Sequence, residues 1–369
     1  MSTFMNCTRC EICAAALNIY APMSFVHFSL LFRLILGPIV TLGILILTLA
    51  IFRTKTLHYN ARLLLMCMTI SVIVCNIGVL LDAIYKLLIS FVLPEEIRCE
   101  YQVYKPQYIF AMRSLHTGGG MGLALSTFFL AAERTLATIT YVTYEQNVRR
   151  WVGIALAVVQ ILLCLPLSIR TSPPPQFYPY VTPYIGNSER TIVFGNILVG
   201  INIFALLVYT TLYLVNRRRR RFLSDSHLRV LSIRFQLREN IATTRLMTPV
   251  MAVVTIMTTS AQWVFYTYLP ILNRETVVTS KVLEQVTRYA PYGEFQLSMM
   301  PVLALLLVLL LPCFNLHIKR SFVRISHLKM CFPEDPPSID TVTAEQARDL
   351  YFAKLKGQCY DNAVPRAQL

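Results

Sequence analysis

The sequence predicts an all-α membrane protein, a seven-transmembrane helix bundle with its N-terminus outside the cell and its C-terminus in the cytoplasm. The composition is the first reason, because the chain of 369 residues is 55% hydrophobic and only 14% charged, against about 25% charged residues in ordinary soluble proteins. The second is that apolar runs of about 20 residues, the length needed to cross a bilayer, recur along the chain. The net charge of +15 would also suit a nucleic-acid binder, but those spread many charges over soluble folds, so no nucleic-acid partner is expected.

Seven apolar runs, bounded by charged or turn residues, predict the membrane spans. They are residues 34–52, 63–85, 109–132, 152–169, 192–215, 246–269 and 296–316. They do not alternate with a period of two, so a β-barrel is not expected. Residues 1–33 are predicted to form an extracellular tail and an outer extension of the first helix, with an eighth span over 14–32 as the alternative. Residues 317–369 are predicted to form a cytoplasmic tail that begins with a short amphipathic helix on the inner leaflet.

Basic residues set the predicted orientation, because short cytoplasmic loops carry an excess of Lys and Arg. The segments 53–62, 133–150, 216–245 and 317–330 hold 19 basic residues, and the segments on the opposite side hold 10. The N-terminus is therefore placed outside, where Asn6 in Asn6-Cys7-Thr8 is a candidate glycosylation site. The run Arg217–Arg221 is expected to attract anionic inner-leaflet lipids, with an acidic partner protein as the alternative.

Cysteines on the predicted outer side face an oxidising environment, in which disulfides form. They are Cys7, Cys10, Cys13 and Cys99. A disulfide from Cys99 to one of the other three would tie the outer start of the third span to the N-terminal tail. The alternative is that these cysteines are free.

Ionisable side chains inside a bilayer are expensive and usually functional. Asp82, Arg113 and His116 all lie near the outer ends of predicted spans, and the last two share one helix face. They predict a polar anchor for a small ligand in a pocket open to the outside. Gln262 and Tyr266 of the sixth span would line the same pocket. The alternative is a structural ion pair between Asp82 and Arg113, or side chains that reach out to the interface.

The inner end of the third span carries Glu133 and Arg134. A carboxylate can hold such an arginine at rest and release it to a partner protein, which makes a two-state switch. The alternative is a side chain that anchors the helix at the membrane boundary. The sequence holds no H-E-x-x-H motif, no Walker loop and no Cys/His set with zinc spacing. No metal, no cofactor and no enzymatic activity are therefore expected.

Three stretches carry a resemblance to a known family. They read His116-Thr-Gly-Gly-Gly-Met-Gly122, then Ala131-Ala-Glu-Arg-Thr-Leu-Ala-Thr138 followed by Tyr144-Glu145, and Leu231-Ser-Ile-Arg-Phe-Gln-Leu-Arg-Glu-Asn240. Over about residues 58–322 the chain resembles the nematode serpentine chemoreceptors of class epsilon (Sre), in the wider Sra group. The glycines have a physical interpretation of their own, which is close helix packing in lipid, with a ligand contact as the alternative.

The resemblance implies a seven-helix receptor that couples to a heterotrimeric G protein and serves chemosensation, in the plasma membrane of sensory-neuron cilia. Its motifs add candidates for G-protein coupling, namely Tyr144, Glu145, Glu239 and Asn240. Arg234 and Arg238 recur at helical spacing and would present a basic face to the G protein. The ligand would be a small molecule or a peptide. The competing interpretation is a seven-span ligand-gated channel or transporter, against which the predicted outer N-terminus argues.

Overall fold

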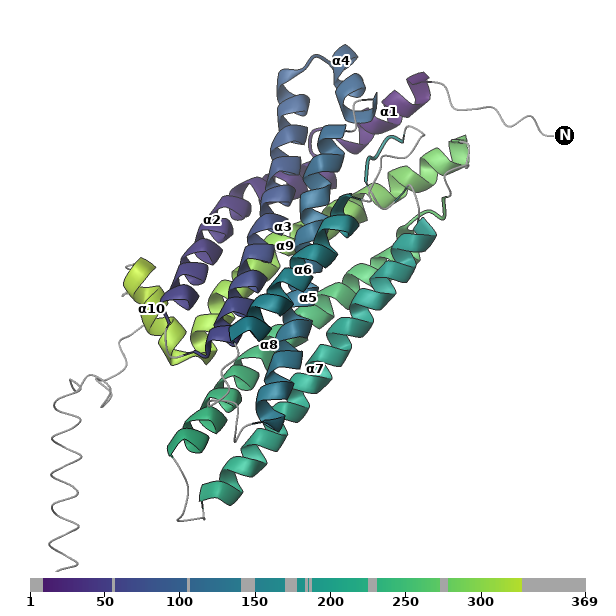
Figure 1. The fold of residues 1–369 in the computed structure, drawn as a ribbon. Coiled ribbons are helices and arrows are strands. Elements are labelled where there is room, and N and C mark those ends of the chain that lie inside the picture. The colour runs from purple at the N-terminus through teal and green to yellow at the C-terminus, as the bar shows by residue number, and fades with distance from the viewer. Residues whose placement is uncertain are drawn as a thin grey trace, which may run out of the picture. The chain divides into compact units, whose positions relative to one another are not determined.

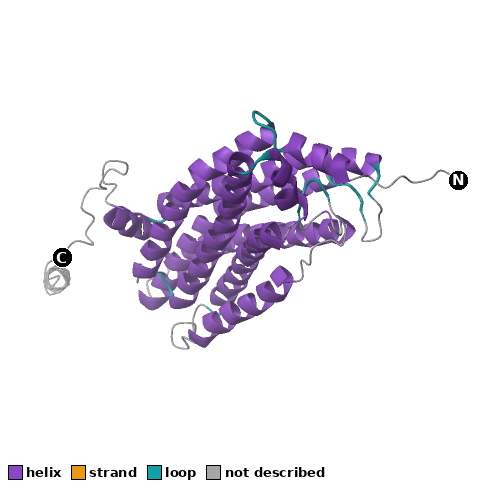
Figure 2. Cartoon of the chain, turned by 90° about the horizontal axis from the view of Figure 1, so that it is seen from above, coloured by secondary structure: helices purple, strands orange, loops and turns teal. Residues whose placement is uncertain are grey.

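The computed structural model describes residues 9–54, 57–104, 107–140, 150–169, 178–182, 185, 188–224, 231–272 and 278–326. Within these ranges all regular structure is helical and no strand is present, as Figure 2 shows. The predicted all-helical class is therefore confirmed for the described residues. Contacts divide the chain into a compact unit of residues 1–325 and a second unit of 326–369, and the helices below are those of the first unit.

The long helices of the described residues correspond in order to the seven predicted spans. They are α2 (Phe25–Arg53), α3 (Tyr59–Val92), α5 (Gln107–Ile139), α6 (Arg150–Ile169), α7 (Ser188–Ser224), α8 (Leu231–Tyr268) and α9 (Ser280–Phe314). The short elements are α1 (Arg9–Ile19), α4 (Glu95–Cys99), the π-helical turn η1 (Glu100–Tyr104) and α10 (Leu316–Ser326). Figure 1 places α1 and α4 at one end of the bundle and α10 at the other.

Five of these helices are long and apolar enough to cross a membrane. They are α2, α3, α7 through Arg221, α8 from Glu239, and α9. Their outer surface is apolar, as on α2, where Ile35, Ile39 and Leu42 are 67, 62 and 58% exposed. Such a surface suits lipid rather than water. The helices α5 and α6 fall outside this group. In α5, glycines and polar side chains interrupt the aliphatic residues, and the apolar part of α6 covers only Trp151–Cys164. A count of seven spans stays a prediction.

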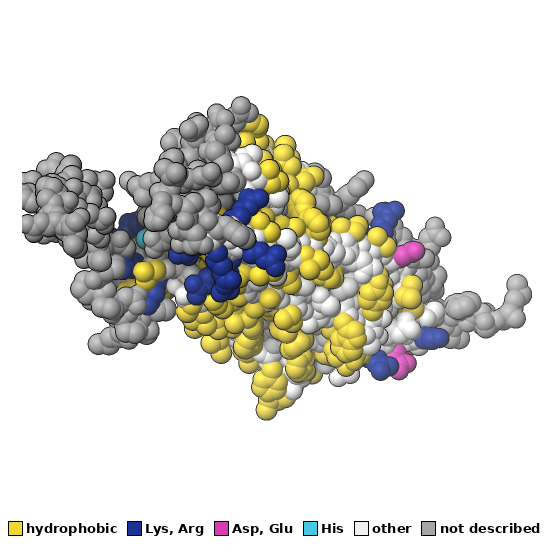
Figure 3. Space-filling view, turned by 90° about the horizontal axis from the view of Figure 1, so that it is seen from below, with side chains coloured by type: hydrophobic (Ala, Val, Ile, Leu, Met, Phe, Trp, Pro, Cys, Tyr) yellow, Lys and Arg dark blue, Asp and Glu magenta, His cyan; other side chains and the backbone are white. Residues whose placement is uncertain are grey.

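Figure 3 shows hydrophobic side chains over much of one face, with Lys and Arg gathered near one end. The end of α7 carries exposed arginines, namely Arg217, Arg218, Arg220 and Arg221. The predicted basic run thus ends a helix whose remaining length is apolar. This arrangement matches an interfacial position for the arginines.

Several helices extend beyond the apolar runs that predicted them. The first begins at Phe25 instead of residue 34, the second continues to Val92 instead of 85, and the last begins at Ser280 instead of 296. The prediction ends each span at or near a charged residue. A helix nevertheless continues past a charged side chain when that side chain has a buried partner. The alternative of an eighth span over 14–32 does not hold, because α1 ends at Ile19 and its 11 residues reach only about 16 Å.

The centre of the bundle is formed by α3 and α5, which pack against each other and contact most of the other long helices. Glycine permits this approach. A Cβ atom on Gly78 would lie 2.6 Å from the carbonyl oxygen of Met112, and one on Gly119 would lie 2.4 Å from the backbone nitrogen of Cys75. Gly120, by contrast, has nothing within 4 Å of such an atom. Close packing therefore explains Gly119 in the glycine-rich stretch but not Gly120.

The short helix α10 corresponds to the predicted amphipathic helix. It covers residues 316–326, so it begins one residue before the predicted start at 317. Asn315 separates it from α9, and its Oδ1 accepts hydrogen bonds from the backbone N–H groups of His317 (3.0 Å) and Ile318 (3.1 Å). This is the usual cap of a helix N-terminus. Ile318 and Phe322 are buried, whereas Arg324 is exposed.

Candidate functional site

A buried ionic cluster lies where four long helices meet, close to the end that carries α1 and α4. Arg33 comes from α2, Asp82 and Lys86 from α3, Arg113 from α5 and Glu294 from α9. Each of these side chains is at most 2% exposed. We call these five residues the outer cluster.

The two carboxylates of the outer cluster bind all three cations. Asp82 accepts from Arg33 at 3.3 Å, from Lys86 at 3.0 Å and from Arg113 at 3.3 Å. Glu294 accepts from Lys86 at 2.7 Å and from Arg113 at 2.8 Å, and its second oxygen accepts from Arg33. Charge-assisted bonds of this kind are the strong ones, so the cluster joins α2, α3, α5 and α9.

Two tyrosines from outside the long helices cover the outer cluster. The ring of Tyr20, in the turn between α1 and α2, lies 5.6 Å from the Lys86 ammonium. The ring of Tyr180, in the segment between α6 and α7, lies 5.6 Å from Lys86 and 5.0 Å from the Arg113 guanidinium. Both are cation–π contacts. Burial raises the pKa of each phenol well above its usual range, and the negative charge of Glu294 acts in the same direction, so both tyrosines are neutral.

The structure separates the five predicted ligand-binding residues into two groups. Asp82 and Arg113 meet in the outer cluster, and His116 lies one turn further along α5, where its Nδ1 is 3.1 Å from the Cys75 sulfur. Gln262 and Tyr266 instead contact α7. Gln262 donates to the carbonyl oxygen of Ile192 and to the Oδ1 of Asn196, each at 3.0 Å, and Tyr266 accepts from Asn196 at 2.6 Å. Tyr266 is 59% exposed.

Sequence reasoning missed three members of the outer cluster. Hydropathy places Arg33, Lys86 and Glu294 in the segments outside the spans, because each lies at the edge of an apolar run. The readable signal was the spacing of Lys86, four residues after Asp82, which places the two charges on one helix face. For Arg33 and Glu294 the sequence holds no comparable local signal, since their partners lie 49 and 261 residues away.

A second buried ionic group lies at the other end of α5. Arg134 donates to both oxygens of Glu133, at 2.5 and 2.6 Å, and to the Oδ1 of Asn240 on α8 at 3.0 Å. Asn240 donates in turn to the carbonyl oxygen of Ala137 at 3.4 Å. Glu133 and Arg134 are each 1% exposed. Of the predicted coupling residues, the structure brings these three together, and we call them the inner lock.

The inner lock has neighbours that connect α5 to the adjacent helices. Glu239 of α8 accepts from the backbone N–H of His58 at 2.5 Å, at the start of α3. Thr138 of α5 accepts from Asn216 at 3.1 Å, and its carbonyl oxygen accepts from Arg219 at 2.7 Å, both on α7. Burial lowers the pKa of His58, and the positive charge of Arg134 lowers it further. Four helices are thus bonded at this end.

Several predicted residues lie outside the described part of the chain. Asn6, Cys7, Tyr144 and Glu145 are not among the described residues, and the side chains of Arg234 and Arg238 are not described. Their roles stay predictions. Within the described ranges no group of three or more His, Cys, Asp or Glu could hold a metal ion.

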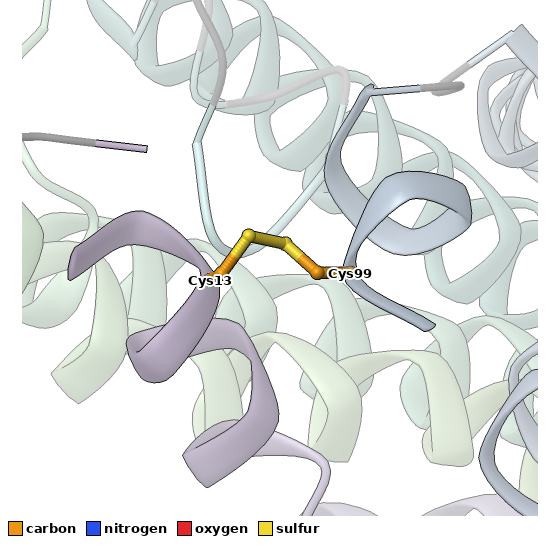
Figure 4. Close-up of a disulfide and its surroundings, with 2 residues drawn as sticks. All are labelled: Cys13 and Cys99. Atoms are coloured by element: carbon orange, nitrogen blue, oxygen red, sulfur yellow. A yellow bond between two sulfur atoms is a disulfide. The ribbon is translucent and has the colours of Figure 1, made fainter. Parts of the chain in front are cut away.

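A disulfide joins Cys13 of α1 to Cys99 of α4, with Cα atoms 5.4 Å apart. Figure 4 shows it bridging the two short helices. Of the three candidate partners of Cys99, the structure thus selects Cys13, while Cys10 is free and exposed. The bond crosses 86 residues of sequence and holds α1 beside α4 and η1.

An all-helical bundle with an apolar outer surface and buried ionic groups at both ends of one central helix is the architecture of a helical membrane receptor. Residues 10–327 match the family model described as serpentine type 7TM GPCR receptor class ab chemoreceptor. The chain therefore belongs to this family of serpentine chemoreceptors, which is a receptor family and not one of enzymes.

One curated relative is the serpentine receptor class alpha/beta-14 of Caenorhabditis elegans. It is 24% identical over 304 residues, which cover 79% of this chain and 74% of that protein. The predicted resemblance to nematode serpentine chemoreceptors is confirmed. The class named from the motifs, epsilon, is not confirmed, because the matching family model is that of class ab.

Proposed function

We propose that this protein is a G-protein-coupled chemosensory receptor with seven membrane spans, an outer N-terminus and a cytoplasmic C-terminus. A small extracellular ligand binds in the outer half of the bundle, and the inner end of the bundle activates a heterotrimeric G protein. The receptor acts in the plasma membrane, and the family points to sensory-neuron cilia. Exposed arginines at the end of α7 and basic residues of α10 contact anionic inner-leaflet lipids.

The observation that carries this proposal is the inner lock. Arg134 is buried, and its partners Glu133 and Asn240 come from α5 itself and from α8. A contact that joins two helices through one charged side chain has two distinct states, bonded and released. Release frees α8 to move and exposes an arginine to a partner protein. A ligand that favours the released state then shifts the population towards it.

Cell-surface labelling and a signalling assay test the proposal together. An epitope tag at residue 2 should be accessible in intact cells, and a tag at the C-terminus only after permeabilisation. In a ligand screen with a calcium readout, Arg134→Ala should abolish the response of an activating compound while surface expression stays near normal. An intracellular N-terminal tag would refute the topology, and an intact response of Arg134→Ala would refute the switch.

A further inference from the structure

The outer cluster holds more positive than negative charge. Its cations are Arg33, Lys86 and Arg113, and its carboxylates are Asp82 and Glu294, so its formal charge is +1. All five side chains are at most 2% exposed. A charge that stays uncompensated inside a membrane protein is costly, and such residues usually mark a site for an ion or a substrate.

The residues around the outer cluster do not supply the missing negative charge. Tyr20 and Tyr180 contact its cations, but both are neutral phenols because burial raises their pKa values. Within the described residues, no third carboxylate is bonded to Arg33, Lys86 or Arg113. The protein alone therefore leaves one positive charge in excess.

Arg113 also keeps unused donor capacity. Its Nε donates to Asp82, and its Nη2 donates to Glu294 and to the Tyr180 hydroxyl. A guanidinium carries five N–H donors, and the Nη1 of Arg113 has no hydrogen-bond partner among the described residues. The two N–H groups of Nη1 can therefore donate charge-assisted hydrogen bonds to an anion such as a carboxylate.

A small cavity lies between the α1–α2 turn and α9, and its lining includes Pro291, three residues before Glu294 of the outer cluster. Its volume is about 160 Å³, and Ile19, Val26 and Thr287 are among its lining residues. A cavity of about 150 Å³ accommodates a molecule the size of benzene, so this one has room for a chain of about four carbons. Tyr20 follows Ile19 directly, and its ring covers Lys86, so binding across both sites requires this ring to rotate out of the way.

We propose that the outer cluster is a binding site for a small carboxylic acid. The carboxylate compensates the excess positive charge at Lys86 and Arg113, and the short apolar chain occupies the cavity lined by Ile19 and Val26. The inference rests on the proposed receptor function in one respect, namely that binding of the acid leads to signalling. Binding of the acid itself does not depend on that function. It names the ligand class of the outer site as an organic anion of about four carbons.

Thermal unfolding of the full-length receptor in detergent tests the proposal, with butanoate as the probe. Butanoate should raise the Tm saturably, because a ligand that binds only the folded state stabilises it by mass action. The matched compounds 1-butanol and butylamine, which lack the negative charge, should leave the Tm unchanged. Sodium chloride at the same ionic strength should produce less than the butanoate shift.

Two variants assign the binding to the cluster and to the cavity. Lys86→Met makes the cluster neutral and should weaken butanoate binding at least tenfold, while the Tm without acid stays equal or rises. The matched control Lys281→Met changes an exposed lysine at the start of α9 and should keep the full shift. Thr287→Phe fills the cavity and should weaken butanoate binding at least tenfold while acetate still binds, which keeps the test decisive if Lys86→Met fails to fold.

Three results would overturn the inference. They are an equal Tm shift with 1-butanol, a sodium chloride shift as large as that of butanoate, and unchanged butanoate binding in both Lys86→Met and Thr287→Phe. The proposed function is tested separately by signalling. An intracellular N-terminal tag or an intact response of Arg134→Ala would count against that function and leave butanoate binding standing, whereas signalling by a receptor that binds no acid would refute this inference alone.

Discussion

Removal of the Asn240 side chain from the inner lock should raise the basal activity of the receptor. In the structure Arg134 donates to Asn240 at 3.0 Å, and this bond joins the arginine to α8. The substitution Asn240→Ala deletes this bond and the longer bond from Asn240 to the carbonyl oxygen of Ala137, but leaves Arg134 paired with Glu133. The buried guanidinium therefore stays neutralised, and the variant should fold.

The size of the effect follows from the type of bond. A hydrogen bond to a charged group contributes about 1.5–3 kcal/mol, and each 1.4 kcal/mol corresponds to roughly a tenfold change in an equilibrium constant. If the bond exists only in the resting state, Asn240→Ala raises the ratio of active to resting receptor by roughly ten- to hundredfold. This change is large enough to appear without a ligand.

The measurement is basal nucleotide exchange in membranes that contain the receptor and a heterotrimeric G protein, normalised to surface receptor. The matched control is Asn202→Ala, which removes another fully buried asparagine that joins α7 to α8 through Thr258 at 3.2 Å, far along α8 from the lock. Equal basal exchange in Asn240→Ala and wild type, at equal expression, would refute the switch. A rise of the same size in Asn202→Ala would show that general loosening, not the lock, is responsible.

Three further predictions concern stability, measured by thermal unfolding in detergent. Cys99→Ser should destabilise the fold by about 2–4 kcal/mol, as the loss of a disulfide usually does, whereas Cys10→Ser should not. Gly119→Ala should cost about 1–3 kcal/mol because its methyl group meets the α3 backbone, whereas Gly120→Ala should be tolerated. Because burial and then the charge of Arg134 lower the pKa of His58, the unfolded state binds more protons, so stability should fall as the pH drops below about 6.5.

Each of these predictions has a control whose result can contradict it. Equal Tm values for the two cysteine variants would show that the disulfide contributes nothing to the folded state. Equal destabilisation by the two glycine variants would place the cause in helix propensity, not in packing against α3. The variant His58→Gln should flatten the decline of stability with falling pH, and an unchanged decline would assign it to other groups.

The fold class and the order of the long helices could be predicted from the sequence, because burial in lipid demands long apolar runs. The limits of the helices could not. A hydropathy pattern ends a predicted span at each charged residue, so it places Arg33, Lys86 and Glu294 outside the spans. Their pairing is invisible along the chain, since Arg33 meets Glu294 across 261 residues. The same limit hid the outer cluster, of which only Asp82 and Arg113 were predicted.

The inner lock was easier to predict, because its members occur in dense motifs. Glu133 and Arg134 are adjacent, and Asn240 ends a stretch that resembles the family. Their contact across 106 residues still required the structure. The family class was harder, since a few short motifs are shared among serpentine receptors, whereas the match over residues 10–327 rests on the whole bundle.

The members of the outer cluster are synthesised at different times, because they lie far apart along the chain. Translation produces Arg33 first, followed by Asp82 and Lys86 and then Arg113. Glu294 is produced only with α9, the last long helix. Until α9 arrives, the nascent cluster holds three cations and a single carboxylate. A chain that stops before residue 294 therefore keeps two excess positive charges in this cluster instead of one, and we expect cellular quality control to act on such a chain. Arrival of the final helix is thus the event that completes the receptor.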